Sequence, residues 1–236
     1  MFVATIYLYN SLRFYSGLGK LQKLHFQKRY HERVEKMKFE ILIMAAGHSS
    51  RMQGDDKLLK KKRKTTMLYD VVSKAIASDV GLVRVVLGYN SNRRFQEIRE
   101  LPAMAHRCSN FSEGLSESIK FGLSKVNPKA DAVIISLADM PLVKASDYRR
   151  LTKGYDPDNN KEICQSISES GLKGHPTLFG RRFFNEIKLI SGDVGGRAII
   201  ERYKEVVQEV STNGNGAIMD IDTISDWVKW KKVMNE

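Results

Sequence analysis

The chain has 236 residues, of which 42% are hydrophobic and 28% are charged, so it is long enough to bury one sizeable core. This composition excludes collagen-like, disordered and small disulfide-bonded proteins. Because Cys108 and Cys164 lie far apart and form no CxxC pair, they provide neither a zinc motif nor a disulfide framework. No apolar run approaches the ~20 residues that span a bilayer, so we expect a cytoplasmic protein without membrane contact.

The net charge of +12 is concentrated in two segments. Residues 1–36 contribute +5 and residues 57–64, KLLKKKRK, contribute +6, so the rest of the chain is nearly neutral. Such an excess favours polyanions, which include nucleotides, phosphorylated cofactors and nucleic acids, but a basic tail and a solvated basic loop have the same composition. Aromatic residues do not alternate with the bases of the second segment, and no helix-turn-helix, RNP or zinc motif occurs, so we expect no nucleic-acid partner.

Residues 1–36 differ in pattern from the rest of the chain. They contain aromatic residues without a strong period and no acidic residue before Glu32, and a second methionine, Met37, directly precedes a clear strand pattern. We therefore expect the folded domain to cover 37–236, with 1–36 as an extension or as the product of a start placed too far upstream. An organelle transit peptide is the alternative, since such peptides are also basic and poor in acids.

From Met37 onward, apolar runs of strand length alternate with segments of helical period. Residues 40–46 and 132–137 are nearly continuous apolar runs, which are typical of strands buried on both faces. Residues 67–78 repeat apolar side chains at amphipathic helical spacing. The patterns predict these elements in chain order: strand 40–46, helix 67–78, strand 82–87, helix 92–100, strand 103–108, helix 115–126, strand 132–137, helix 146–154, strand 162–168, helix 181–190, helix 195–203 and strand 217–221.

This alternation predicts a single-domain α/β fold, a Rossmann-like and mostly parallel sheet with helices on both faces. Ligands of such sheets bind at the carboxyl ends of the strands. The first strand runs into AAGHSSRM, residues 45–52, where small residues let backbone amides approach an anion and Arg51 and Lys57 add positive charge. Neither GxxxxGK[ST] nor GxGxxG is present, so from the residues alone a phosphate-binding loop and an ordinary turn both stay open.

Six motifs follow one another along the chain: ILIMAAGHSSRM followed by KLL (41–52 and 57–59), NFSEGLSESI (110–119), LADMP (137–141), GHPTLF (174–179), SGDVGGR (191–197) and DIDT (220–223). In this order they resemble the nucleotidyltransferases that attach CTP or GTP to the molybdenum cofactor. The AAG of the first motif and the GLS of the second are similar to the cytidylyltransferase branch, MocA-like, whereas the guanylyltransferase branch usually reads LAGG and GPLAG. Gln53 stands where the family has glycine, and TISD at 223–226 replaces TPED.

The resemblance implies a GT-A-like nucleotidyltransferase that transfers CMP from CTP to the terminal phosphate of molybdopterin, uses Mg²⁺, releases pyrophosphate and supplies a molybdenum hydroxylase. A phosphate nucleophile is already ionised at neutral pH, so no catalytic Ser/His or Cys/His pair is required. The residues that match the family's motifs are, for catalysis, Lys57, Arg51 and Asp139; for binding CTP and the pterin, Ala45, Ala46, Gly47, Ser49, Gly114, Ser116 and His175; and for the metal, Asp139 and Asp222. Asp220 is the alternative second metal ligand, because alternation in a strand at 217–221 would aim both carboxylates the same way.

Several residues in these motifs and in the basic run also have an ordinary structural interpretation. Asp139 would belong to a strand-end turn, His175 to the core, and 60–64 to a solvated loop, while Asp193 and Arg197 would cap and flank a helix. We expect both cysteines to be buried and unreactive. The rival functions are another cytidylyl- or guanylyltransferase of the same fold, such as the enzyme that acts on methylerythritol phosphate, an accessory factor for molybdenum hydroxylases, and, from a different class, a nucleic-acid-binding module.

Overall fold

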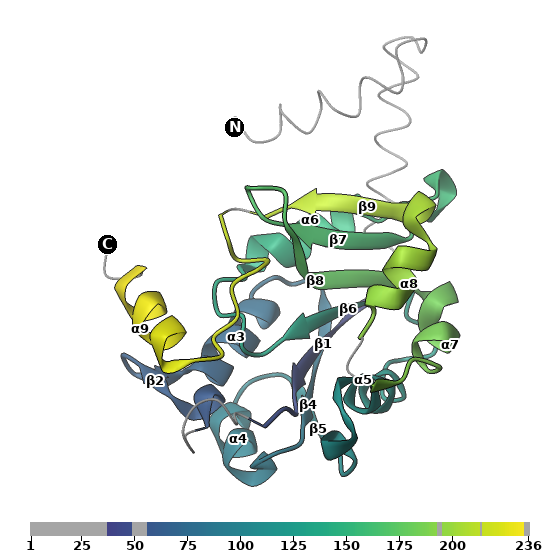
Figure 1. Cartoon of the computed structure of the whole chain (residues 1–236). Coiled ribbons are helices and arrows are strands. Elements are labelled where there is room, and N and C mark those ends of the chain that lie inside the picture. Colours follow the sequence, from purple (N-terminus) through teal and green to yellow (C-terminus); the bar gives the residue numbers. More distant parts are fainter. Residues whose placement is uncertain (1–36, 49–55, 193–194, 213, 234–236) are drawn as a thin grey trace. The chain divides into compact units, whose positions relative to one another are not determined.

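A strand that is buried on both faces, β1 (Phe39–Ala45), lies inside the sheet of the computed structural model (Figure 1). All seven of its side chains are buried, as its nearly unbroken apolar run predicts. It pairs in parallel with β4 (Gly81–Leu87) on one side and β6 (Ala132–Leu137) on the other. The structure describes residues 37–48, 56–192, 195–212 and 214–233, and the chain from Lys38 on forms one compact unit. The predicted role of residues 1–36 lies outside the described residues.

Among the described residues, the main sheet has seven strands in the order β5-β4-β1-β6-β8-β7-β9. Its remaining strands are β5 (Met104–Arg107), β7 (Ile163–Ile167), β8 (Lys173–Gly180) and β9 (Val207–Ser211). Strand β8 runs antiparallel to both of its neighbours, and the other pairs are parallel. The predicted α/β fold with a mostly parallel sheet is therefore confirmed. The carboxyl ends of β1, β4, β5 and β6 meet at one edge of the sheet.

Helices cover both faces of the sheet. On one face lie α3 (Met67–Ile76), α4 (Ser91–Ile98) and α6 (Ala145–Gly154); on the other lie α5 (Leu115–Leu123), α7 (Phe184–Ile187) and α8 (Arg197–Arg202). Gly122 permits the close approach of α5, because a Cβ there would lie 2.7 Å from Val86 and 2.8 Å from Leu42. Short 3₁₀ helices connect these elements at η2 (Lys57–Leu59), η3 (Phe111–Glu113), η4 (Pro157–Asn159), η5 (Arg181–Phe183) and η7 (Lys204–Val206).

The prediction of a last strand over 217–221 is wrong. Ile218 and Met219 both donate backbone hydrogen bonds to the Asn215 carbonyl, at 3.1 Å each, so the chain turns there. The apolar spacing arises because Ala217 and Ile221 are both buried at the two ends of this segment. The edge position beside β7 belongs instead to β9, which the sequence reading missed together with β8.

The other predicted elements are present, although several are shorter than expected. The predicted helix over 181–190 is split into η5 and α7, and the one over 195–203 is reduced to α8. Cys108 and Cys164 are buried as expected, and burial raises the pKa of the Cys164 thiol. Among the described residues no helix is long and apolar enough to cross a bilayer.

The basic run is more ordered than the solvated loop that its charge predicted. It forms a two-stranded antiparallel hairpin, β2 (Lys61–Lys62) and β3 (Thr65–Thr66), which lies beside a helix the sequence reading missed, α9 (Ile224–Val233) (Figure 1). The Lys62 ammonium lies 4.4 Å from the ring centroid of Trp230 and donates to the Trp230 carbonyl at 3.3 Å. The hairpin is therefore packed against α9 through cation–π contact.

Candidate active site

Lys57 lies between two carboxylates at the carboxyl edge of the sheet. Its Nζ is 2.7 Å from Asp139 Oδ2 and 2.6 Å from Asp222 Oδ1. The three side chains are 13%, 23% and 25% exposed, so the cluster is largely shielded but still open to a ligand. The structure thus brings together three residues that the motifs predicted from three distant parts of the chain.

Backbone hydrogen bonds fix the position of Asp139. The Ala138 N–H donates to the Met44 carbonyl at 3.0 Å, which extends the pairing of β1 and β6 by one step beyond the end of β6. The Ile221 N–H donates to the Asp139 carbonyl, also at 3.0 Å. The chain after β6 is therefore tied to the segment that carries Asp222, and the two carboxylates are brought together without a strand at 217–221.

The charges of this cluster influence one another. Burial lowers the pKa of Lys57, but its ion pairs with Asp139 and Asp222 outweigh burial and raise the pKa above the ordinary value of 10.5. Burial raises the pKa of Asp220, and the negative charges of Asp222 and Asp139 raise it further. Acidic groups are therefore crowded around one ammonium, and a further cation would relieve their repulsion.

The donor set at this edge fits a hard divalent cation. Asp139 Oδ1 is buried and has no hydrogen-bond partner among the described residues, so its lone pairs remain available. The described part of the chain contains no group of three or more His, Cys, Asp and Glu side chains arranged to hold a metal. Two carboxylates are nevertheless sufficient when phosphate oxygens of a ligand and waters complete the coordination, as is usual for Mg²⁺.

The first loop begins directly at the end of β1. Ala45 and Ala46 are buried, Gly47 is exposed, and a Cβ at Gly47 would meet no atom of the described residues within 4 Å. A glycine at this position lets an anion approach the backbone closely. The predicted residues Ser49 and Arg51 lie outside the described residues, so their roles remain predictions.

Gly114, Ser116 and His175 were the other predicted binding residues. Gly114 adopts a φ of 113°, which favours glycine, immediately before α5. Ser116 is fully buried, and its Oγ finds no hydrogen-bond partner in the part of the chain that the structure describes. Both residues stand at the beginning of the helix that follows β5, and so at the same edge of the sheet as Lys57.

His175 reaches this edge from the antiparallel strand β8. Its backbone N–H donates to the Ala217 carbonyl at 2.8 Å, and a Cβ at Gly174 would clash with that same carbonyl. Burial lowers the pKa of His175, while the charge of Asp139 opposes the effect. The imidazole is therefore neutral at pH 7, and its buried Nδ1 has no partner among the described residues.

Comparison with known proteins identifies the architecture around this cluster. The family model described as MobA-like NTP transferase domain matches residues 41–206. The chain belongs to this family. The matched range begins at the third residue of β1 and contains the first loop, Lys57 and Asp139, whereas Asp222 and α9 follow it. No curated protein sequence is significantly similar to the chain.

Solved structures share the fold of this MobA-like NTP transferase domain. Rv0371c from Mycobacterium tuberculosis H37Rv superposes with a TM-score of 0.73 at 24% identity, over 83% of this chain and 98% of that one. The Methanothermobacter nucleotidyl transferase Mth528 has a TM-score of 0.70 at 19% identity, over 84% and 98%. CMP:2-keto-3-deoxy-manno-octonic acid synthetase complexed with CTP has a TM-score of 0.66 at 16% identity, also over 84% and 98%. At these identities the likeness shows a common fold.

Sequence reasoning missed two charged residues that the MobA-like domain buries beside its first loop. Arg94 of α4 and Asp56, the residue before Lys57, form an ion pair at 2.9 Å with side chains 0% and 4% exposed. The helical pattern of 92–100 predicts a solvent-exposed arginine, and no local motif signals its burial. Only contact between segments 38 positions apart in the sequence reveals the pair.

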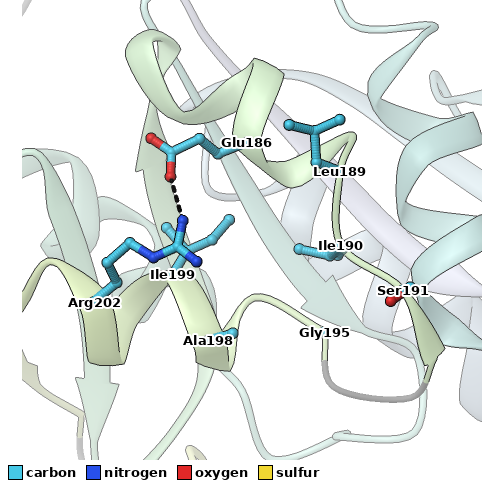
Figure 2. A pocket seen from close by; sticks show the side chains of 8 residues that line it. All are labelled: Glu186, Leu189, Ile190, Ser191, Gly195, Ala198, Ile199 and Arg202. Atoms are coloured by element: carbon cyan, nitrogen blue, oxygen red, sulfur yellow. Dashed lines mark ion pairs between the residues drawn. The ribbon is translucent and has the colours of Figure 1, made fainter.

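A pocket of about 260 Å³ lies between α7 and α8 of the MobA-like domain (Figure 2). Figure 2 shows Glu186 and Arg202 facing each other across one side of it, where they form an ion pair at 3.5 Å. The lining residues are Glu186, Leu189, Ile190, Ser191, Gly195, Ala198, Ile199 and Arg202. None of the residues predicted to catalyse or bind belongs to this set. Arg197, on the same helix as Arg202, pairs with Glu201 at 2.8 Å, and Asp193 lies outside the described residues.

Proposed function

We propose that this domain is a molybdenum cofactor cytidylyltransferase that moves CMP from CTP to the terminal phosphate of molybdopterin and releases pyrophosphate. The observation that carries the proposal is the ammonium of Lys57 held between the carboxylates of Asp139 and Asp222 at the carboxyl edge of the sheet. This cluster combines a cation for phosphate with two oxygen ligands for a metal, which are the groups that nucleotidyl transfer requires.

The reaction requires positioning and charge more than acid–base chemistry. An oxygen of the acceptor's phosphate attacks the α-phosphorus of CTP, the bond from that phosphorus to the oxygen of the β-phosphate breaks, and pyrophosphate leaves with the electron pair. The nucleophile is already ionised at pH 7, so no residue needs to remove a proton. Lys57 stabilises negative charge on the phosphates, and the buried surroundings strengthen that interaction.

A divalent cation would be held by Asp139 and Asp222. When bound, it supplies Lewis-acid stabilisation of the phosphate oxygens. Asp139 Oδ1, which has no hydrogen-bond partner among the described residues, offers the free ligand position. A manganese complex of Rv0371c supports divalent metal binding in this fold, and we assign Mg²⁺ to the present chain because carboxylates and phosphates are its preferred ligands.

The nucleotide and acceptor assignments rest on different residues. The AAG of residues 45–47 and the GLS of residues 114–116 support CTP over GTP, and the CTP complex of a structural neighbour shows that the fold accommodates this nucleotide. The GHPTLF segment, residues 174–179 of β8, supports the pterin, since it contains His175, whose pKa is influenced by the charge of Asp139. We further propose that a molybdenum hydroxylase receives the product.

The test incubates the full chain with Mg²⁺, molybdopterin and each of the four nucleoside triphosphates, and measures pyrophosphate release. We expect kcat/KM for CTP to exceed that for GTP by about tenfold or more, a difference of ~1.4 kcal/mol in transition-state binding. Equal or reversed values refute the choice of CTP. Parallel reactions with methylerythritol phosphate as the acceptor test the nearest rival: faster turnover there than with molybdopterin refutes the acceptor.

A further inference from the structure

The guanidinium of Arg94 joins both sides of the first loop. Its Nε and Nη2 each donate to one oxygen of Asp56 at 2.9 Å, Nη1 donates to the Ala45 carbonyl at 2.7 Å, and Nη2 donates to the Gly47 carbonyl at 3.1 Å. Ala45 and Gly47 precede residues 48–55, and Asp56 follows them. One planar side chain therefore holds the chain before and after this segment at a fixed separation.

Asp56 passes this constraint on to Lys57. Its Oδ1 also accepts the backbone N–H of Leu58 at 3.1 Å, which caps η2, and Lys57 is the first residue of that helix. Its Oδ2 accepts a further hydrogen bond from Asn90 Nδ2 at 3.1 Å. Leu58, the middle residue of η2, is buried, so its side chain also anchors this short helix. An unbroken series of contacts thus leads from Arg94 through Asp56 to Lys57.

We propose that Arg94 is a positioning residue of the active site, which acts through Asp56 to place the Lys57 ammonium between Asp139 and Asp222. The inference rests on the proposed nucleotidyl transfer at Lys57. Lysine cannot replace Arg94, because reaching a carboxylate and two carbonyls at once requires several donors in one rigid plane. The Tyr89 ring, 5.5 Å from the guanidinium carbon, and the adjacent His48 ring complete the packing around it.

A second buried arginine provides the matched control. Arg84 of β4 pairs with Glu40 of β1, and both residues are buried, but this pair joins neighbouring strands and forms no hydrogen bond with the described residues of the first loop. Removing a whole buried ion pair is often tolerated when hydrophobic residues of similar size replace it. The double variant Arg94→Met/Asp56→Leu and the control Arg84→Met/Glu40→Leu therefore each remove one buried arginine–carboxylate pair, the first beside the first loop and the second within the sheet.

The experiment measures the dissociation constant of Mg²⁺–CTP by calorimetry, kcat/KM and the melting temperature on the same preparations. We expect the Arg94/Asp56 variant to bind Mg²⁺–CTP at least about tenfold more weakly, and the Arg84/Glu40 variant to bind like the wild type even where its melting temperature falls. If Arg94 and Asp56 act only through Lys57, adding their substitutions to Lys57→Met should cause no further loss in kcat/KM. Residues that act independently would instead show additive losses. Additive losses, or wild-type affinity in the folded Arg94/Asp56 variant, overturn the inference.

A milder variant keeps the test decisive if the double variant does not fold. Asn90 has a φ of 53°, which glycine adopts freely, so Asn90→Gly removes one hydrogen bond to Asp56 without backbone strain. We expect it to weaken Mg²⁺–CTP binding by about two- to fivefold, the equivalent of one hydrogen bond. Unchanged binding contradicts the inference. A wild-type chain that binds Mg²⁺–CTP but releases no pyrophosphate refutes the proposed function instead, and the binding comparison still tests Arg94.

Discussion

Two buried arginine–carboxylate pairs of this domain have different roles. Arg84 and Glu40 join β4 to β1, where backbone hydrogen bonds already fix the two strands, and the Asn127 N–H donates to Glu40 at 3.1 Å. Arg94 of α4 instead contacts Gly47 and Asp56, and of the described residues these two belong to no strand. Burial alone therefore does not distinguish a structural ion pair from one that serves the site. What distinguishes them is whether the chain they connect is otherwise fixed.

The largest expected effect is the loss of turnover when Lys57, the residue that the Arg94–Asp56 pair positions, is replaced. Lys57→Met removes the ammonium that both carboxylates contact, so turnover should fall by roughly 10²- to 10³-fold, the scale of losing one major electrostatic stabiliser. Pyrophosphate release by purified protein measures it. Lys61→Met removes the same charge from an exposed position of the same basic run and should turn over normally. Normal turnover in Lys57→Met would show that Lys57 does not take part in the reaction.

The next effect concerns stability and sharpens the comparison of the two pairs. Arg84→Met leaves the Glu40 carboxylate buried without its cation, which costs about 3–5 kcal/mol in the free energy of unfolding. Arg94→Met leaves Asp56 in the same situation and should cost a similar amount. Denaturant unfolding measures both values, and nucleotide affinity below the transition should change only in Arg94→Met. If Arg84→Met also weakened nucleotide affinity, the two ion pairs would not differ in their effect on the site.

Acid should weaken the Arg84 region through His106. Burial and the charges of Arg84 and Lys125 lower the pKa of His106 below its ordinary 6.5, and the opposite effect of Glu40 does not outweigh them. Below pH 6.5 the unfolded chain therefore binds more protons than the folded chain, so stability declines as the pH falls through this value and is unaffected above it. Melting temperatures between pH 7.5 and pH 5 should fall less steeply for His106→Gln than for the wild type. Since His175 is present in both proteins, parallel curves would show that His106 does not contribute.

The smallest effect is expected at the hairpin, away from both pairs. Lys62→Met loses the contact with Trp230 and should cost about 0.5–1 kcal/mol, the range for cation–π contacts near the protein surface. Lys61→Met, at the exposed neighbour, is the control and should leave the melting temperature unchanged. Equal melting temperatures for the two variants would show that the cation–π contact contributes nothing.

The sequence predicts those elements of the fold whose buried side chains recur at a regular spacing along the chain. The runs of β1 and β6 are buried on both faces, and the period of α3 matches its buried stripe, so local patterns suffice. The segment 217–221 has the pattern of a strand because a turn with two buried ends has the same apolar spacing. Strand β8 contains Gly174 and Pro176, which usually argue against a strand, so its local pattern does not predict one.

The sequence predicts a residue of the candidate site only where that residue belongs to a short local motif. Lys57, Asp139 and Asp222 each stand in a short recognisable segment, and the structure brings them into contact. Arg94 has no such segment, because its partners are backbone carbonyls and a carboxylate 38 positions away, and any exposed arginine of an amphipathic helix looks the same in the sequence. Positioning residues of this kind become visible only when the tertiary contacts are known.

Asp139→Asn is the sharpest test of the proposal that Asp139 and Lys57 carry out metal-dependent nucleotidyl transfer. Asp131→Asn is the matched control, since Asp131 pairs with Arg181 at the protein surface and lies outside the site. Pyrophosphate release at saturating CTP is measured across a Mg²⁺ titration, with the melting temperature taken on the same preparation. The account predicts that Asp139→Asn loses roughly 10²- to 10³-fold in turnover while it stays folded, and that Asp131→Asn behaves like the wild type. Wild-type turnover in Asp139→Asn at saturating CTP and Mg²⁺ would contradict it.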